Sequence, residues 1–523
     1  MLPRLVPATA AALREALTRA GYTTDGVRTL LGPQAHSALG RGEPEPAFRA
    51  AAGAGELGVL VRLLLLGATE PDDAVAAALA PLAPADVAAA GLLRRDGDGW
   101  AAAVDVRPHG LDDHDWWVVS DLDTRRQDRE YVTGVGAASL TLAAATLRSP
   151  AGSVLDLGTG CGVQALHAST RAGSVTATDV APRALAMAAA TFALNDVDVE
   201  LLAGPWFTPV TGRRFDRIVS NPPFVPGPPR LDLVYRDSGR GGDDALADLV
   251  RALPAHLAPG GIGQLLGAWL HVRGEDWTER VRSWLPGGVD AWVLQREVTE
   301  PALHVGTWQR DAGVDPASPA GRAQAARWLD WMESERVEGI GFGFLTLRRT
   351  AGEPAVVFED LPGAMDDPLG PEVAGWLDRL DWLRAHRTDD ALLGARLAVA
   401  GTVVLERYAT AGEEGWAEAG AAVVRADGPR WRHEVDELAA ALLAGCRGAL
   451  PLRELLELLA FAHDRPVGEL AAAALPAVRD LVRHGLLVPA AWADAAAAEA
   501  ADPPGAGTGV AGAGRARTRG GPA

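Results

Sequence analysis

Short apolar runs alternate with longer stretches of helical periodicity between residues 153 and 347, and this alternation dominates the middle of the chain. The pattern is typical of a parallel sheet whose strands are joined by crossover helices. The runs predict seven strands, at Ser153–Leu157, Ser174–Asp179, Val197–Ala203, Phe215–Ser220, Gly261–Val272, Ala291–Val298 and Gly341–Arg348. We therefore expect an α/β domain built on a seven-stranded sheet.

A strongly helical stretch, 320–336, lies between the last two predicted strands and carries Trp328, Trp331 and Met332. An aromatic stripe at helical spacing is more often part of a core than of a ligand site. We expect these three side chains to pack in the core.

The two ends of the chain predict smaller, mainly helical domains. Residues 8–20, 45–66 and 72–80 carry apolar residues at helical spacing, and a turn at 96–99 then separates two short runs that predict a β-hairpin. Helices followed by a hairpin are typical of a winged-helix-like module. Residues 451–489 again predict helices that end in a short apolar run. Acidic residues outnumber arginines in the first hairpin, which favours packing or protein contact there over nucleic-acid binding.

Composition narrows the class of partner. The chain has 523 residues and a formal net charge of −19. Broad adhesion to nucleic acid or anionic membrane needs clustered cations, so this charge disfavours it. Cys161 and Cys446 lie far apart, which excludes a disulfide framework and a paired-cysteine zinc site. The most apolar run, 57–66, has about half of the roughly twenty residues that a membrane span needs. We expect a cytoplasmic protein with no metal and no membrane partner.

The first motif with chemical content follows the first predicted strand, where Asp156 precedes a turn with glycines at 158, 160 and 162. Alternate glycines let a backbone turn tightly and approach a ligand, and the following helix presents free N–H groups. The next strand ends in Asp179, whose carboxylate could accept hydrogen bonds from the two ribose hydroxyls of an adenosine ligand. An isolated Asp before Pro182 would more simply cap a helix, but its position beside the glycine turn favours the ribose role.

The second motif is Asn221-Pro222-Pro223-Phe224, at the end of the fourth predicted strand. Two prolines fix φ and remove N–H donors, so the Pro222 carbonyl is free to accept. That carbonyl and the Asn221 side-chain oxygen can each accept one N–H of an NH₂ group, which orients its nitrogen for methylation. Phe224 can stack on the planar group. The same four residues could form a simple turn, but their place in the fold argues against it.

At these two motifs the chain resembles the class I S-adenosylmethionine-dependent methyltransferases, in particular the release-factor glutamine methyltransferases and the related methyltransferase small-domain family. The resemblance covers about Val132–Gly267 and implies a Rossmann-like fold with S-adenosyl-L-methionine as cofactor. It implies catalytic roles for Asn221, Pro222 and Phe224. It implies cofactor contacts from Asp156, Gly158, Thr159, Gly160, Cys161, Gly162, Asp179, Trp206 and Asn221. Pro205 stands where the family usually has Asp, which puts one polar contact to the adenine in doubt, and residues 131–139 occupy the place of the family's lid.

The pattern along the chain, together with this resemblance, predicts four regions. We expect a helical, winged-helix-like domain at 1–110, a class I methyltransferase domain at 111–352, an α/β domain with a helix-turn-helix-like end at 353–494, and a disordered tail at 495–523.

The motifs identify nitrogen chemistry without identifying the acceptor. The acceptor favoured by the resemblance is a protein glutamine on an exposed loop. The alternatives are an exocyclic amine of RNA or DNA, at guanine N2 or adenine N6, and a non-enzymatic regulator that senses S-adenosylmethionine. A duplex base would have to be flipped out of its stack to reach Asn221, whereas a glutamine could enter directly.

Overall fold

The computed structural model describes residues 2–111, 114–123, 126, 128–223, 225–229, 239–363, 365–366, 368–412 and 415–493. These fall into two units, Met1–Val373 and Ala374–Ala523. The tail predicted at 495–523 lies outside the described residues. None of the helices described is both long and apolar enough to cross a membrane.

An eight-stranded sheet forms the centre of the first unit, in the order β13-β11-β12-β10-β9-β6-β7-β8. β12 runs antiparallel to β10 and β11, whereas the other neighbouring pairs are parallel. The strands are β6 (Ala151–Leu157), β7 (Ala172–Asp179), β8 (Glu200–Ala203), β9 (Phe215–Ser220), β10 (Leu257–Val272), β11 (Val289–Thr299), β12 (Val337–Arg349) and β13 (Val356–Asp360).

All seven predicted strands are present in this sheet, where they correspond to β6 through β12. The eighth strand, β13, was not predicted. It pairs in parallel with β11 through Ala291 and Val356, so the sheet extends past residue 352, where we expected this domain to end.

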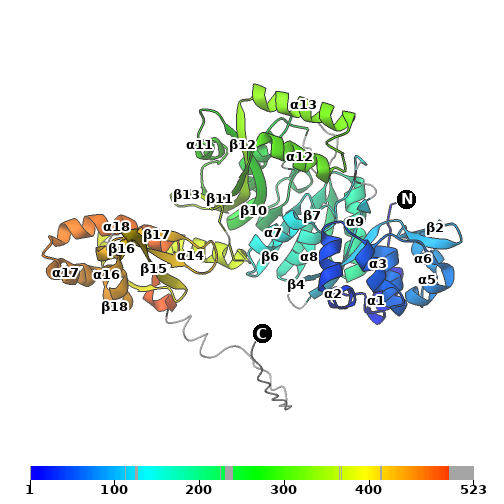
Figure 1. Cartoon of the computed structure of the whole chain (residues 1–523), viewed down its shortest axis with the longest axis horizontal. Helices are drawn as coiled ribbons and strands as arrows, with labels where there is room; N and C mark the ends of the chain where they lie inside the picture. The colour runs from blue at the N-terminus through cyan, green and yellow to red at the C-terminus, as the bar shows by residue number, and fades with distance from the viewer. Residues whose placement is uncertain are drawn as a thin grey trace, which may run out of the picture. The chain divides into compact units, whose positions relative to one another are not determined.

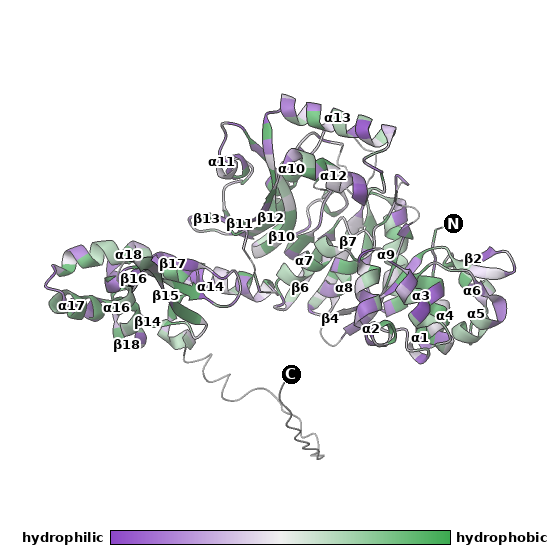
Figure 2. Ribbon diagram, in the orientation of Figure 1, coloured by the Kyte–Doolittle hydropathy of each residue, from purple (hydrophilic) through white to green (hydrophobic). Residues whose placement is uncertain are grey.

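Helices cover both faces of the sheet (Figure 1). Successive side chains of a strand point to opposite faces, so on β10 Leu265 packs with Leu246 of α10 while Leu266 packs with Leu142 of α7. The helices of this domain are α7 (Ala137–Ala145), α8 (Val163–Ser169), α9 (Pro182–Asn195), α10 (Asp244–Ala252), α11 (Trp277–Arg282), α12 (Pro301–Asp311) and α13 (Pro319–Ser334), with 3-10 turns η3 (Thr208–Val210) and η4 (Leu253–His256). Figure 2 shows the strands as predominantly hydrophobic and the covering helices with hydrophilic segments.

The predicted aromatic stripe on α13 is in the core. Trp328 and Met332 are 6% and 1% exposed, and Trp331 packs against them together with the ends of β10 and β12. The prediction of a core role for these residues is confirmed.

The N-terminal helices and the hairpin that we expected are present and share one hydrophobic core with the central domain. Leu13 and Leu17 of α1 belong to the same buried cluster as Ala188 and Phe192 of α9. The elements are α1 (Pro7–Arg19), α2 (Thr24–Gly40), α3 (Glu45–Ala51), α4 (Gly55–Leu60), π-helix η1 (Val61–Leu65), α5 (Asp72–Leu79), α6 (Pro84–Ala89), β1 (Glu70–Pro71), β2 (Leu93–Asp96) and β3 (Gly99–Ala102).

A second hairpin joins this helical part to the sheet domain. It pairs β4 (Asp105–Leu111) with β5 (His114–Ser120), and the predicted boundary at residue 110 falls inside it. Asn195 at the end of α9 accepts from the Trp117 backbone N–H at 2.9 Å and donates to the Trp117 carbonyl at 2.8 Å. The hairpin is therefore hydrogen-bonded to α9 as well as packed on it.

The second unit contains two small sheets, β18-β14-β19 and β15-β16-β17, with helices. The helices and the final strand that we expected after residue 451 are present, whereas the β15-β16-β17 sheet was not predicted. The elements that lie wholly in this unit are α15 (Asp389–Leu393), β14 (Arg396–Val399), β15 (Val403–Gly412), β16 (Gly415–Arg425), β17 (Arg432–Val435), α16 (Glu437–Gly445), β18 (Arg447–Pro451), α17 (Leu452–Ala462), α18 (Val467–Arg483) and β19 (Leu487–Pro489); α14 (Gly370–Ala385) spans the division.

Candidate active site

A cavity of about 820 Å³ lies at the carboxyl ends of β6, β7 and β9. Ligands of open α/β sheets bind at this edge, where the strand order reverses, and small-molecule sites measure about 300–1,000 Å³. The wall includes the glycine turn after β6, the end of β7, residues 129–134 and 136–139, residues 204–206 and residues 221–223. The cavity therefore joins the two motifs that the sequence singled out.

The glycine turn needs glycine because its backbone has positive φ and because one of its positions leaves no room for a side chain. Gly158 and Gly160 have φ of +76° and +55°, and a Cβ at either would meet no atom within 4 Å because the turn faces open space. Gly162, at φ +88°, is not part of the cavity wall. A Cβ there would lie 2.7 Å from the Phe192 ring. Gly162 therefore lies where α8 packs against α9, outside the cavity wall, and its contact with the cofactor stays a prediction.

Asp156 supports the turn from beneath. Its Oδ2 accepts from the Thr159 hydroxyl at 2.6 Å and from the Ala165 N–H at 3.1 Å, and the residue is 1% exposed. Burial raises the pKa of this carboxyl to about 7. Thr159 lines the cavity and Asp156 does not, so the structure places Asp156 behind the predicted contact surface.

Asp179 lies in the cavity wall at the end of β7. One carboxylate oxygen accepts from the Gly160 N–H at 3.0 Å and the other from the Ala181 N–H at 2.9 Å. Burial raises the pKa of this carboxyl. Asp179 thus ties the glycine turn to the residue before α9, but it is not the N-cap of that helix, which is Ala181. Its contact with a ribose stays a prediction.

Asn221 is the buried polar group of the cavity that stands out. Its Oδ1 is inaccessible to solvent and, within the described part of the chain, accepts no hydrogen bond. Buried side-chain acceptors are nearly always paired, so this oxygen is suited to a donor on a ligand. Pro222 and Pro223 lie beside it in the wall, and Phe224 lies outside the described residues.

Two further predicted residues lie in the wall. Trp206 is 39% exposed, and its backbone has φ of +50°, a conformation that non-glycine residues adopt infrequently. Pro205 precedes it. Cys161 is buried, and burial raises the pKa of its thiol to about 12, so this thiol is not an activated nucleophile.

The part of the cavity wall that contains Val132 is held in place by a buried ion pair. Asp121 accepts from Arg183 Nε at 2.7 Å and also pairs with its terminal nitrogen. The same carboxylate accepts from the Val132 N–H at 3.0 Å, which secures residues that line the cavity.

We predict that Arg183→Met lowers the free energy of unfolding by about 3–5 kcal/mol, because it removes the guanidinium that pairs with the buried Asp121 carboxylate. Urea denaturation measures this change. The matched control, Arg28→Met, removes an exposed pair with Asp25 and should change stability by less than about 1 kcal/mol. The double variant Arg183→Met/Asp121→Asn should recover most of the stability that Arg183→Met loses. A double variant that is as unstable as Arg183→Met alone would contradict the ion-pair explanation.

Trp308, Asp311 and Gln164 are among the wall residues that sequence reasoning missed. Trp308 and Asp311 come from α12, in a segment without a motif, and only proximity in the fold brings them to the cavity. Gln164 donates to the Ser139 carbonyl at 2.7 Å and so joins α8 to α7. Within the described ranges, no group of three or more His, Cys, Asp or Glu side chains is placed to hold a metal ion.

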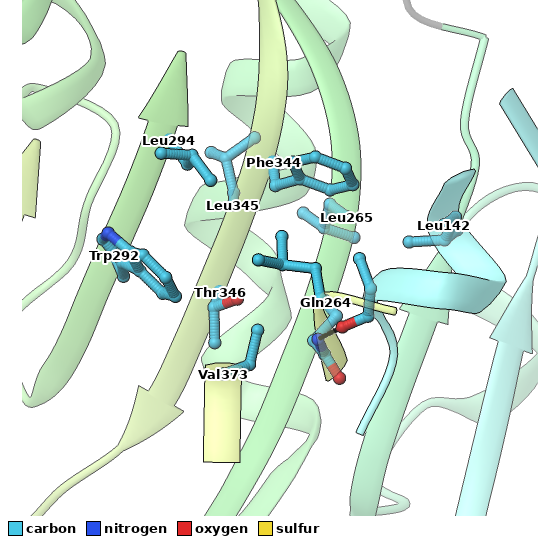
Figure 3. Close-up of a pocket in the computed structure, with 11 residues that line it drawn as sticks. Leu142, Gln264, Leu265, Trp292, Leu294, Phe344, Leu345, Thr346 and Val373 are labelled. Carbon is cyan, nitrogen blue, oxygen red and sulfur yellow. Dashed lines mark hydrogen bonds between the residues drawn. The ribbon is translucent and has the colours of Figure 1, made fainter. Parts of the chain in front are cut away.

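A second cavity, of about 10 Å³, lies between β10, β11 and β12 (Figure 3). It has room for about one water molecule. Leucine, phenylalanine and valine side chains form most of its wall, and the Gln264 amide is already satisfied by the Leu147 N–H at 2.8 Å and the Ala145 carbonyl at 2.7 Å. It is a packing void and not a ligand site.

Comparisons with known proteins agree with this geometry. Residues 133–237 match the family model described as "Methyltransferase small domain". Residues 19–103 and 374–489 match two domains of unknown function, DUF7059 and DUF7782. The resemblance to the methyltransferase small-domain family and the α/β fold class, both predicted from the sequence, are confirmed.

Curated relatives share part of the chain. A release factor glutamine methyltransferase of Gloeobacter violaceus is 37% identical over 132 residues, which are 22% of this chain and 46% of that protein. A ribosomal RNA small subunit methyltransferase C of Pasteurella multocida is 38% identical over 119 residues, which are 22% of this chain and 33% of that protein. The chain thus spans less than half the length of these relatives.

Solved structures with a likeness include the T. thermophilus 16S rRNA N2 G1207 methyltransferase in complex with AdoMet and guanosine, with 18% identity, a TM-score of 0.26, and coverage of 38% of this chain and 53% of that one. Another is an S-adenosyl-L-homocysteine complex of a methyltransferase from Thiobacillus denitrificans, with 18% identity, a TM-score of 0.25, and coverage of 43% and 96%.

Proposed function

We propose, on the premise that residues 133–237 form a methyltransferase small domain, that the protein transfers a methyl group from S-adenosylmethionine to a planar amide or amine nitrogen, and that the acceptor is a glutamine side chain of another protein. The observation that carries this proposal is the buried Asn221 Oδ1, which accepts no hydrogen bond within the described residues and shares a cavity with the glycine turn.

The cavity fits this cofactor. The open space before Gly158 and Gly160 admits a ligand to the backbone of the turn, Asp179 offers carboxylate oxygens to ribose hydroxyls, and the Trp206 indole offers a planar surface to adenine. When bound, S-adenosylmethionine supplies a methyl group on a sulfonium, and the electrons of the broken C–S bond return to sulfur.

The residues of the second motif orient the acceptor. In this proposal the Asn221 side-chain oxygen and the Pro222 carbonyl each accept one N–H of the acceptor NH₂ group, which directs the nitrogen lone pair at the methyl carbon. The nitrogen lone pair forms the new N–C bond, and one N–H proton leaves for solvent. The Asn221 Oδ1 atom is inaccessible to solvent, so water does not compete for the hydrogen bond that it accepts.

The charge of the cavity favours a protein acceptor. Its described wall carries three carboxylates, Glu130, Asp179 and Asp311, and one guanidinium, Arg129. A phosphodiester backbone would be repelled there, whereas a neutral glutamine side chain would not. The second candidate, N-methylation of a base in RNA, is supported by the likeness to the ribosomal RNA methyltransferase.

A labelling experiment separates the two acceptors. Purified protein and radiolabelled S-adenosylmethionine are incubated with a lysate of cells that lack the gene, and parallel samples are treated with protease or ribonuclease. We expect label that resists ribonuclease and yields N5-methylglutamine on hydrolysis. Label that ribonuclease releases and protease leaves would refute the glutamine proposal in favour of RNA, and the absence of any transfer would refute both.

We expect Asp179→Ala to weaken cofactor binding by about 1–3 kcal/mol, the cost of a lost hydrogen bond to a charged group, or about 5–150-fold in Kd. Isothermal titration calorimetry measures it. Asp179→Asn keeps one acceptor oxygen and should lose less. A Kd within twofold of wild type for the alanine variant would contradict the ribose role.

A further inference from the structure

The segment between β11 and β12 forms two helices, α12 and α13, at the carboxyl end of β10 (Figure 1). These helices lie outside all three matched family models. They belong to the first unit and pack on the ends of β10 and β12. We call the segment that contains α12 and α13 the insertion. It contributes to the cavity from a part of the chain that neither motif includes.

A hydrogen-bonded relay connects α12 to the loop that follows Asn221. His304 is 5% exposed, and its Nε2 lies 3.0 Å from the Pro226 carbonyl oxygen. The Trp308 indole N–H donates to His304 Nδ1 at 3.2 Å. Because Nδ1 accepts, it carries no proton, and Nε2 must carry the proton that it donates to Pro226. The relay therefore requires a neutral imidazole in one tautomer.

The loop is also pressed closely against α13. Gly227 follows Pro226, and a Cβ at Gly227 would lie 2.6 Å from the Trp328 ring, so only glycine fits without displacement. The Gly227 carbonyl accepts from the Gly242 N–H at 2.8 Å. Contacts from α12, from α13 and from Gly242, which precedes α10, thus hold Pro226 and Gly227 in position.

Trp308 is at the same time part of the cavity wall. It is partly exposed, lines the cavity that contains Asn221, and lies one helical turn from Asp311, which lines the cavity too. A single side chain thus contacts the space for the acceptor and, through His304, the loop that shapes this space. An indole face is suited to a planar amide that slides over it.

We infer that Trp308 is a specificity-determining residue whose indole binds the planar group of the acceptor, and that His304 is a positioning residue that holds the loop after Asn221 through the Pro226 carbonyl. This inference rests on the proposed function and extends it to the insertion. The acceptor class is the planar amide of a polypeptide side chain, in agreement with the three carboxylates and one guanidinium of the described cavity wall.

The kinetic test uses the full-length chain, S-adenosylmethionine and nuclease-treated protein extract of cells that lack the gene. Trp308→Ala should raise the half-saturating extract concentration about tenfold or more, whereas Trp308→Phe keeps a planar ring and should recover most of it. His304→Ala should lower kcat about 10–100-fold because the loop shifts, whereas His304→Gln retains an N–H donor near the Nε2 position and should stay within about threefold. The cofactor Kd should remain within about twofold of wild type in all four variants.

A matched control comes from the same helix. Leu303 on α12 is 50% exposed and is not part of the cavity wall, so Leu303→Ala should keep both kinetic constants. Equal effects of Leu303→Ala and Trp308→Ala would indicate a general disturbance of α12 and overturn the inference.

A measurement without turnover tests the relay itself. In protein labelled with ¹⁵N-histidine, the His304 signals are identified by their loss in His304→Gln, and we expect an unprotonated Nδ1 beside a protonated Nε2. A protonated Nδ1 would overturn the relay.

The outcomes separate the two proposals. A wild-type protein that binds S-adenosylmethionine and methylates the extract, while Trp308→Ala and His304→Ala keep wild-type constants, overturns only this inference. A wild-type protein that does not bind S-adenosylmethionine refutes the proposed function, and the ¹⁵N-histidine measurement still decides whether the relay exists. Methylation found only on RNA overturns the polypeptide acceptor.

Discussion

Asn221→Ala is expected to lower methyl transfer by about 10²–10³-fold, comparable to the loss of one preorganised hydrogen-bonding group in other active sites, while the fold stays intact. Asn221 Oδ1 has no hydrogen-bond partner to lose among the described residues. The loss should therefore concern the acceptor nitrogen, which would keep only the Pro222 carbonyl as an acceptor.

Single-turnover rates with bound cofactor measure this loss apart from changes in cofactor affinity, which we expect to be modest. Asn221→Asp keeps an acceptor oxygen in the same place but adds a charge, and should retain more activity than the alanine variant. Thermal unfolding at the wild-type temperature would exclude a folding defect. Near wild-type turnover by Asn221→Ala would show that the acceptor nitrogen is oriented by other groups.

Gly160→Val is expected to abolish cofactor binding, with a Kd raised more than about a hundredfold, which corresponds to about 2.7 kcal/mol or more. Gly160 has φ of +55°, which a β-branched residue adopts only with strain, and the added side chain would enter the space in front of the turn. The Gly160 N–H also holds Asp179, so a distorted turn displaces a second predicted contact.

A matched variant distinguishes the effect of backbone strain from the effect of blocking the cofactor site. Gly212 has φ of +79°, and a Cβ there also meets no atom within 4 Å, but this glycine lies in an exposed turn away from the cavity wall. Gly212→Val should lose stability as Gly160→Val does and still bind S-adenosylmethionine. Titration calorimetry of both variants decides the matter: equal binding by the two would mean that the glycine turn is not the cofactor site.

The strands of the sheet were predictable where an apolar run is ended by a recognisable motif. β9 begins at Phe215 and ends at Ser220, as expected, because an apolar run is stopped there by Asn-Pro-Pro. β13 was missed because it is a short run after Pro354 whose partner, β11, is distant in sequence. Long-range pairing of this kind leaves little local signal.

The residues of the candidate site also divide into those that motifs predict and those that they do not. Asp179, Asn221 and Trp206 could be placed in the cavity wall from motifs. Asp156 could not be separated from them, because a sequence does not show that its carboxylate turns inward toward Thr159 and Ala165. Trp308 gave no signal at all, since its place in the wall depends on how α12 packs. Their roles toward cofactor and acceptor stay predictions.

The hydrophobic core shared by α1 and α9 makes the N-terminal helices a reporter of what happens at the glycine turn. α8 and α9 begin at the cavity, and their buried residues Ala165 and Phe192 belong to the same cluster as Leu13 and Leu17. A ligand that binds only the native state stabilises every region that unfolds together with its site. Amide hydrogens of α1 should therefore exchange more slowly when the cavity is filled, although no residue of α1 lines it.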